Sequence, residues 1–263
     1  MRARNRQDAI FNGKLRPSDY RALIAHFRES RKDRLTIEKE SSRDGSKLSA
    51  LLNNNGGPSW WLLYELSFIH LAALGCVVYG WTEKIQQFSQ SENPPLEFVK
   101  FASSDDAELD PHDTWDDARK AMCLQIVLAM CPSMEAIGLH GCSINELLEQ
   151  AQRGDKRRFL DAMAIDRTVI LTSTGAQLLA HAQLSHDRTF LNSVFKRMKE
   201  PRKKLLTYAD LRLVTRLLVD AGDFASCSGK EIRALIDELD IASPPGVKEL
   251  RDQMQRFRKN ATA

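Results

Sequence analysis

The chain has 263 residues, of which 43% are hydrophobic and 28% are charged, and its formal net charge is +3. It contains only 13 Gly and 9 Pro, which argues against a turn-rich all-β fold, and so mild a charge neither requires nor excludes a nucleic-acid partner. Residues that favour helices are abundant. We therefore expect a mainly α, multi-helical soluble protein with a buried central apolar helix and a C-terminal three-helix unit.

Composition divides the chain into four regions. They are an N-terminal helical region with the central apolar helix (1–88), an acidic Pro-containing linker or loop (89–118), a helical middle region (119–204) and a C-terminal three-helix unit with a basic last helix (205–263). The first helix is expected to begin at Pro17 or Ser18, because proline is favoured in the first turn of a helix. The apolar stripe of this helix is then formed by Tyr20, Leu23, Ile24 and Phe27.

The most apolar stretch covers residues 59–81 and has aromatic residues at both ends. A run of about 20 apolar residues with aromatic flanks suits a membrane span. Residues 121–139 form a second such run, so a two-span membrane-associated protein is one alternative. Glu65 opposes it, because an acidic side chain at the bilayer centre costs about 2.5–3.5 kcal/mol. We predict instead a buried core helix over Leu62–Val78, with His70 as a core histidine.

The acidic region 89–118 carries three prolines and is predicted to be a linker or a long surface loop. Phe98, Phe101 and Trp115 lie in it or at its end. If these aromatic side chains are exposed, they offer a contact for another protein. A protein-interaction module or small effector that binds a protein partner through this loop is therefore a further alternative.

Helix starts are clearest in the second half of the chain. Ser143 with Glu146, and Ser228 with Glu231, have the spacing of capping boxes. The run RTVILTSTG is the most strand-like segment, because three β-favouring residues follow one another before a turn. The last helix is expected after a proline pair, with an apolar face formed by Val247, Leu250, Met254 and Phe257.

Five cysteines are present, an odd number, and no CxxC pair occurs. We interpret them as reduced thiols of a cytoplasmic protein. Cys131, His140 and Cys142 have a spacing that fits no common zinc site, so no metal is expected. No cofactor-binding or catalytic motif stands out, and we expect a non-enzymatic protein.

Basic residues form three clusters, and the third, KRMKEPRKK, has six positive charges in nine residues. The other two contain Arg28, Arg31, Lys32 and Arg34, and Lys156, Arg157 and Arg158. The last helix adds a basic face opposite its apolar stripe. A compact three-helix unit with such a helix resembles a DNA-reading helix-turn-helix in outline, although the segment SPPGV is longer than the turn of that motif and Asp252 interrupts the basic face.

These clusters predict a regulatory or accessory protein that contacts DNA or RNA through basic helical faces, since phosphate contacts need only well-placed Lys and Arg. The residues expected to bind nucleic acid are Lys196, Arg197, Arg202, Lys203, Lys204, Lys248, Arg251, Arg258 and Lys259.

Overall fold

The computed structural model describes residues 17–41, 43, 46–54, 59–91, 97, 101, 115–200, 207–222, 224, 225 and 227–261, without the side chains of 53, 54 and 259–261. Throughout these residues the regular structure is helical, which confirms the mainly α prediction. The chain forms two compact units. Unit 1 comprises Met1–Asp33 with Pro132–Ala263, and unit 2 comprises Arg34–Cys131.

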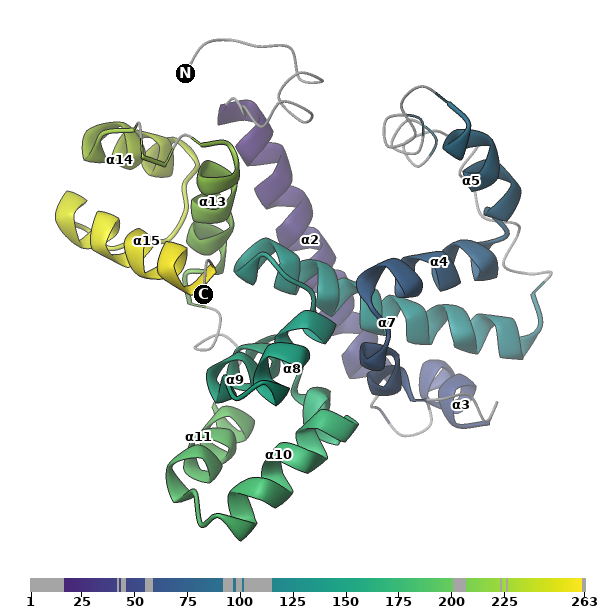
Figure 1. Cartoon of the computed structure of the whole chain (residues 1–263). Coiled ribbons are helices and arrows are strands. Elements are labelled where there is room, and N and C mark those ends of the chain that lie inside the picture. The colour runs from purple at the N-terminus through teal and green to yellow at the C-terminus, as the bar shows by residue number, and fades with distance from the viewer. Residues whose placement is uncertain are drawn as a thin grey trace. The chain divides into compact units, whose positions relative to one another are not determined.

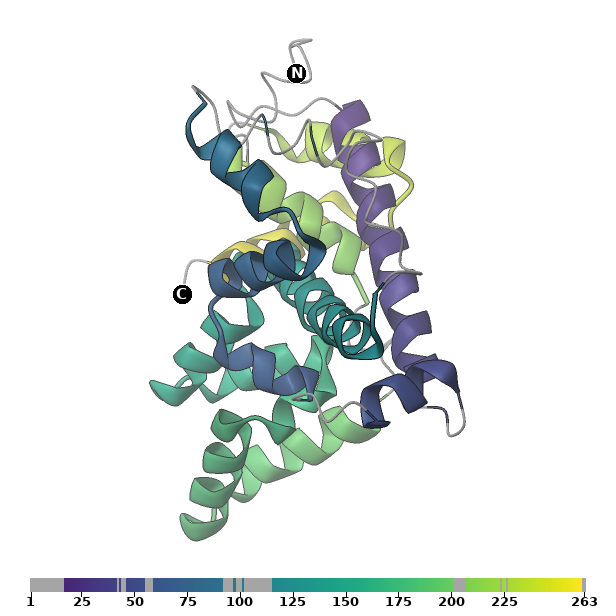
Figure 2. The same cartoon turned by 90° about the vertical axis from the view of Figure 1, so that its right-hand side faces the viewer.

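The elements are shown in chain order in Figure 1. The first half contains α2 (Pro17–Ser41), α3 (Lys47–Asn54), the 3-10 helix η1 (Trp60–Glu65), α4 (Phe68–Tyr79), α5 (Thr82–Ser89) and α7 (Asp117–His140). The second half contains α8 (Ile144–Gln152), α9 (Lys156–Ile165), the 3-10 helix η4 (Arg167–Leu171), α10 (Ser173–Leu184), α11 (Arg188–Lys199), α13 (Ala209–Asp220), α14 (Gly229–Glu238) and α15 (Val247–Ala261). Figure 2 shows α2 as one long continuous helix.

The C-terminal helices α13, α14 and α15 share one hydrophobic core. Leu250 and Met254 of α15 are fully buried in it and Phe257 is nearly so, as the apolar stripe of that helix predicts, whereas Val247 at its start is 41% exposed. Tyr20 and Ile24 of α2 join the same core. The three-helix unit therefore packs with a fourth helix that comes from the opposite end of the sequence.

Both predicted capping boxes are present. At α8, the backbone N–H of Ser143 donates to Oε2 of Glu146 over 2.6 Å, and the Glu146 N–H donates back to Oγ of Ser143 over 3.3 Å. At α14, Ser228 and Glu231 make the same reciprocal pair. Each box satisfies donors that a helix start would otherwise leave unpaired, so these two boundaries are set locally.

The strand prediction for RTVILTSTG is wrong, because the segment forms η4 followed directly by α10. Asp166 caps the 3-10 helix by accepting a bond from the N–H of Thr168, and Thr172 caps α10 by accepting one from the N–H of Gly175. A Cβ at Gly175 would stand 2.5 Å from the carbonyl oxygen of Val169, so only glycine permits this close approach. Capping and packing outweigh the β-propensity of three residues here.

The apolar stretch is not one buried helix as predicted. After η1, Leu66 is extended, and α4 begins at Phe68 behind a Ser67 cap. Ile69 of α4 is 78% exposed and Val77 is 61% exposed. His70 is also exposed, with its Nδ1 2.9 Å from Oγ of Ser67, so it is not a core histidine. Ser67 interrupts the apolar stretch because it caps the start of α4.

Among the described helices, α7 has the length and apolar composition that could cross a membrane, and half of its most apolar stretch is buried within the protein. A core helix of a soluble protein meets the same criterion. The 12-residue α4 is shorter than the roughly 20 residues that a span requires.

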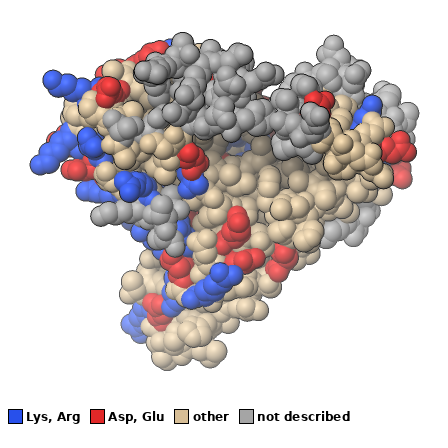
Figure 3. All heavy atoms as spheres, turned by 45° about the horizontal axis from the view of Figure 1, so that its top comes forward, with Lys and Arg blue, Asp and Glu red and all other residues tan. Residues whose placement is uncertain are grey.

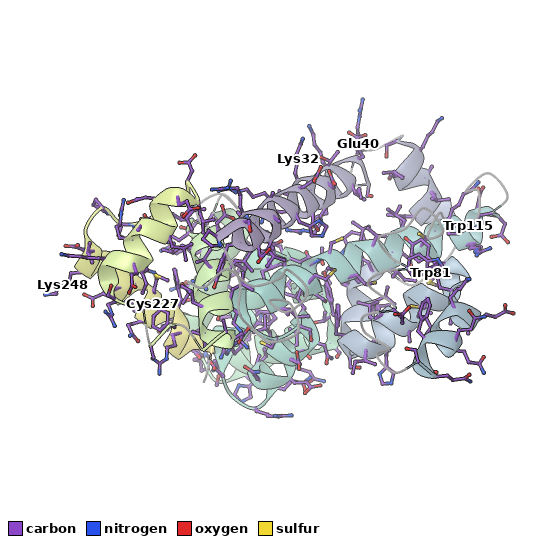
Figure 4. The ribbon with its side chains drawn as sticks, turned by 90° about the horizontal axis from the view of Figure 1, so that it is seen from above. Lys32, Glu40, Trp81, Trp115, Cys227 and Lys248 are labelled. Carbon is purple, nitrogen blue, oxygen red and sulfur yellow. The ribbon has the colours of Figure 1, made fainter. Side chains whose placement is uncertain are left out.

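Unit 2 is organised around an aromatic cluster, labelled in part in Figure 4. Trp81 lies edge-on to Phe101 with ring centroids 5.4 Å apart, and Tyr79 lies 5.9 Å from Trp115. Phe101 and Trp115 are 9% and 4% exposed. The expectation of an exposed aromatic loop is therefore wrong for these two residues, since their rings fill the interior of unit 2. Phe98 lies outside the described residues.

Candidate functional site

Five helices of unit 1 surround a partly enclosed cavity of about 170 Å³. Its walls combine basic, acidic and apolar side chains with the segment that leads into α13. The lining residues are Leu139 and His140 from α7, Asp161 and Ala164 from α9, Arg197 from α11, Thr207, Tyr208, Ala209 and Arg212 around the start of α13, and Gln253 and Phe257 from α15.

His140 is a buried histidine without a close partner. It is 5% exposed, and its Nδ1 lies 3.9 Å from Oδ2 of Asp161, which is beyond hydrogen-bonding distance. Its ring forms no hydrogen bond with the residues the structure describes. Burial, assisted by Arg212 and Arg158, lowers the pKa of His140 to about 3, so the imidazole is neutral at physiological pH.

Asp161 is the carboxylate of the cavity. Burial raises its pKa above the ordinary value, although Arg212, Arg157 and Arg158 act in the opposite direction. Nη1 of Arg158 lies 3.9 Å from Oδ2 of Asp161, so this contact is loose. One carboxylate thus stands among several guanidinium groups.

Arg212 projects from α13 with its guanidinium stacked over the ring of Phe257, 4.5 Å from the ring centroid. Burial lowers the pKa of Arg212, Asp161 raises it, and Arg157 and Arg197 lower it further by repulsion. The cavity therefore carries a surplus of positive charge. Such a surplus favours a negatively charged ligand.

The start of α13 also lies at the cavity. Tyr208 precedes the helix with φ of 29° and provides no side-chain cap for its first turn. The first N–H groups of a helix carry partial positive charge and attract anions. Asp210 in this turn is held by Nε of Arg28 over 2.8 Å, so its charge is already compensated.

A second, shallower hollow of about 490 Å³ lies between α8 and α10. Lys156 lines it, but its Nζ lies 2.6 Å from Oδ2 of Asp187. Gln152 donates to Oγ1 of Thr174 over 2.6 Å. Because these polar groups are already engaged in hydrogen bonds or ion pairs within the protein, the cavity around Arg212 is the stronger candidate for a ligand site.

The structure separates the predicted nucleic-acid-binding residues. Arg197 lines the cavity, and its neighbour Lys196 is exposed. Lys248, at the start of α15, is exposed and points away from the ribbon in Figure 4. Arg251 is half-buried with its guanidinium beside Gly229.

The remaining predicted cations are described in part. Arg258 lies with its guanidinium 5.9 Å from the ring centroid of Phe224. Lys259 falls within α15, but its side chain is outside the described atoms, and so are Arg202, Lys203 and Lys204 as a whole. The face predicted for α15 is thus partly engaged with α14 and the segment before it.

The first basic cluster proves to be structural. Arg28 pairs with Asp210, Arg31 with Glu135 over 2.6 Å, and Arg34 with Glu38 over 2.7 Å. In the second cluster, Lys156 and Arg158 are paired with carboxylates, at Asp187 and Asp155 respectively. Lys and Arg side chains in these positions stabilise contacts between helices or within one.

Sequence reasoning missed Arg212 and Asp161, and it considered His140 only as a metal ligand. Neither Arg212 nor Asp161 belongs to a motif. Arg212 lies within an amphipathic helix, and the residues on either side of it in the sequence are leucines. Their common place on one cavity depends on helices far apart in the sequence. Within the described ranges, no three His, Cys, Asp or Glu side chains gather in a way that could hold a metal ion.

Comparison with known proteins gives no relative from which a function could be carried over. The chain matches no protein-family model, and neither a curated protein nor a solved structure is significantly similar to it.

Proposed function

We propose that unit 1 contacts the phosphate backbone of a nucleic acid through Lys196, Arg197, Lys248 and Arg251. The observation that carries this proposal is that these four side chains form no ion pair within the described part of the chain. A cation without an ion pair is available to a phosphate, although Arg197 shares the cavity with the carboxylate of Asp161.

Some other cations of unit 1 are paired with carboxylates. Arg153, for example, is held by Glu149 and Arg233 by Asp237, each one helical turn along. Figure 3 shows Lys and Arg side chains gathered on the left of the visible face, over the C-terminal helices. A polyanion would meet positive charge on this side of the molecule.

The exposed side of α15 favours phosphate contact over the reading of bases. Lys248 is followed by Glu249 and Asp252, both exposed, so a helix laid deep in a groove would bring these acids against phosphates. Contacts to the backbone by scattered Lys and Arg avoid this repulsion and carry no sequence information. We therefore expect binding with little sequence preference.

The test is the salt dependence of binding. Affinity for a short DNA duplex and for an RNA duplex of the same sequence is measured by fluorescence anisotropy over a series of KCl concentrations. If all four residues contact phosphates, log K falls with log[salt] with a slope of about −3.6, that is, about −0.9 for each contact. The variant with Lys196→Gln, Arg197→Gln, Lys248→Gln and Arg251→Gln is expected to lose most of that slope.

The matched control is Arg153→Gln together with Arg21→Gln, which also removes positive charge from unit 1 but takes it from arginines paired with Glu149 and Glu238. This control should keep the wild-type slope. Equal slopes for the wild-type protein and the four-residue variant, or no binding at low salt, would refute the proposal.

A further inference from the structure

We propose that the cavity binds one terminal phosphate group, a phosphate monoester at the end of a nucleic-acid strand, through Arg197, Arg212 and His140. The identity of the strand rests on the function proposed above. The phosphate site itself rests on the cavity and is tested separately below.

The donors at the cavity suit a phosphate. Arg197 and Arg212 present planar guanidinium groups, which bind the oxygens of a phosphate in pairs. A neutral imidazole has one N–H to donate, and the ring of His140 has no partner among the described residues. Stacking on Phe257 holds Arg212 in place before any ligand arrives, which lowers the entropic cost of binding.

Charge balance points to the same ligand. Without a ligand, Arg212 is repelled by Arg157 and Arg197, and Asp161 is the one carboxylate among the described residues that line the cavity. A phosphate would add negative charge where this repulsion is concentrated. The first turn of α13, for which the side chain of Tyr208 provides no cap, adds backbone N–H groups that attract the same ligand.

Shape restricts the ligand to a strand end. A cavity of about 170 Å³ accepts a group larger than a water molecule, whose share of liquid volume is about 30 Å³. Leu139, Ala164 and Phe257 form an apolar part of its wall. A phosphate inside a duplex carries a sugar on both sides and needs a wider opening than a terminal phosphate, which enters with one sugar behind it.

The surface beyond the cavity is compatible with a strand that continues outward. Lys196 precedes Arg197 on α11 and is exposed. A terminal phosphate held at Arg197 would therefore place the following phosphates near a further cation. This arrangement links the cavity to the backbone contacts proposed for unit 1.

The experiment compares one short single strand in three forms, with a 5′-phosphate, with a 3′-phosphate and with hydroxyls at both ends. Binding is measured at constant salt, and inorganic phosphate is tested alone by isothermal titration calorimetry. We expect one phosphorylated form to bind at least about tenfold more tightly than the hydroxyl form, since hydrogen bonds to charged groups contribute about 1.5–3 kcal/mol. Inorganic phosphate should bind and should compete for this difference.

Two variants locate the effect in the cavity. Arg212→Met removes the charge, and Ala164→Leu fills the space without changing any charge, so each should abolish the tenfold preference. Arg216→Met is the matched control, because Arg216 lies one turn along on α13 and is bound to Asp220 over 2.9 Å. It should retain the preference. Thermal melting confirms that each variant is folded, and the Arg212 variant decides the test if the leucine variant is not.

The outcomes separate this inference from the proposed function. A salt-dependent affinity for duplex that persists while inorganic phosphate fails to bind, or an unchanged preference in Arg212→Met, would overturn the cavity site and leave the backbone contacts standing. Binding of inorganic phosphate that is lost in Arg212→Met, without any affinity for a strand or duplex, would support the phosphate site for a free phosphate ester and overturn both the strand end and the proposed function.

Discussion

In both the cavity of unit 1 and the aromatic cluster of unit 2, an arginine stacks on an aromatic ring. The two arginines differ in whether their guanidinium groups also form hydrogen bonds. In unit 2, Arg119 stacks 4.2 Å from the centroid of Trp115 and also donates from Nε to the carbonyl of Val78 over 2.9 Å. In unit 1, the guanidinium of Arg212 stacks on Phe257 but makes no hydrogen bond within the described residues. One arginine stabilises the fold and the other is left available.

This difference distinguishes the candidate site from a core. In a core, close packing and hydrogen bonds hold buried groups in place, as the stacking of Arg119 on Trp115 and its bond to Val78 do in unit 2. At the cavity, Arg157 and Arg197 repel Arg212, and the ring of His140 forms no hydrogen bond with the described residues. Groups of this kind are typical of sites where stability is exchanged for function.

The largest expected effect tests the core side of the comparison. Trp115→Ala should lower the free energy of unfolding by about 3–5 kcal/mol, because a buried aromatic ring is lost and a cavity remains. Urea denaturation followed by circular dichroism measures it. Val77→Ala is the control in the same unit, since Val77 is 61% exposed, and should change stability by less than about 0.5 kcal/mol. Similar losses in both variants would contradict the buried cluster.

The pH dependence of the free energy of unfolding tests whether His140 is buried at the cavity in its neutral form. The pKa of His140 is about 3 in the folded protein against an ordinary value of 6.5, so between these values the unfolded chain binds one more proton. Stability should therefore fall as the pH drops below 6.5, by up to about 1.4 kcal/mol per pH unit from this residue. In His140→Leu this contribution disappears.

The measurement is the free energy of unfolding of both proteins at several pH values around 5. Asp161, whose pKa is raised by burial, contributes a slope of opposite sign, but it is present in both proteins and largely cancels in the comparison. Identical slopes for the wild-type protein and His140→Leu would show that the histidine is not buried in its neutral form.

A smaller effect on stability is expected from the capping box at the start of α8. Ser143→Ala removes the side-chain half of the capping box of α8 and should lower the free energy of unfolding by about 1 kcal/mol. Ser193→Ala is the control, because its Oγ donates only to the carbonyl of Thr189 within α11. A loss in Ser143→Ala no greater than in this control would mean that packing alone fixes the start of α8.

The smallest expected change in stability is that of Arg212→Met, and it is compared directly with Arg119→Met. Arg212→Met should change the free energy of unfolding by less than about 1 kcal/mol, because the loss of stacking is offset by the removal of a repelled, desolvated cation. Arg119→Met should cost about 1.5–3 kcal/mol, since a hydrogen bond to a charged donor is lost. Equal losses, measured by urea denaturation, would remove the distinction between the two arginines.

Local signals in the sequence predicted much of the secondary structure. The capping boxes at Ser143 and Ser228 and the apolar stripe through Leu250 and Met254 act over a few residues, so neighbouring letters contain them in full. The same reasoning failed for Arg167–Leu171 and for the stretch around Ser67. There a cap and close packing outweighed the propensity or apolarity of the run.

The candidate site was predicted only in part. Arg197 was expected from its basic cluster, but a dense cluster does not show which cations are paired. Arg28 and Arg31 also belong to a basic cluster, but they pair with Asp210 and Glu135, which lie more than 100 residues away in the sequence.

By itself the sequence determined that the chain is helical and where several helices begin, because caps and periodic apolar residues act between neighbours along the chain. Tertiary structure alone decided that His140, Asp161 and Arg212 share one cavity, and that Trp115 is buried. The physical reason is that burial and charge repulsion depend on distances in space between distant segments, and no local pattern of residues encodes those distances.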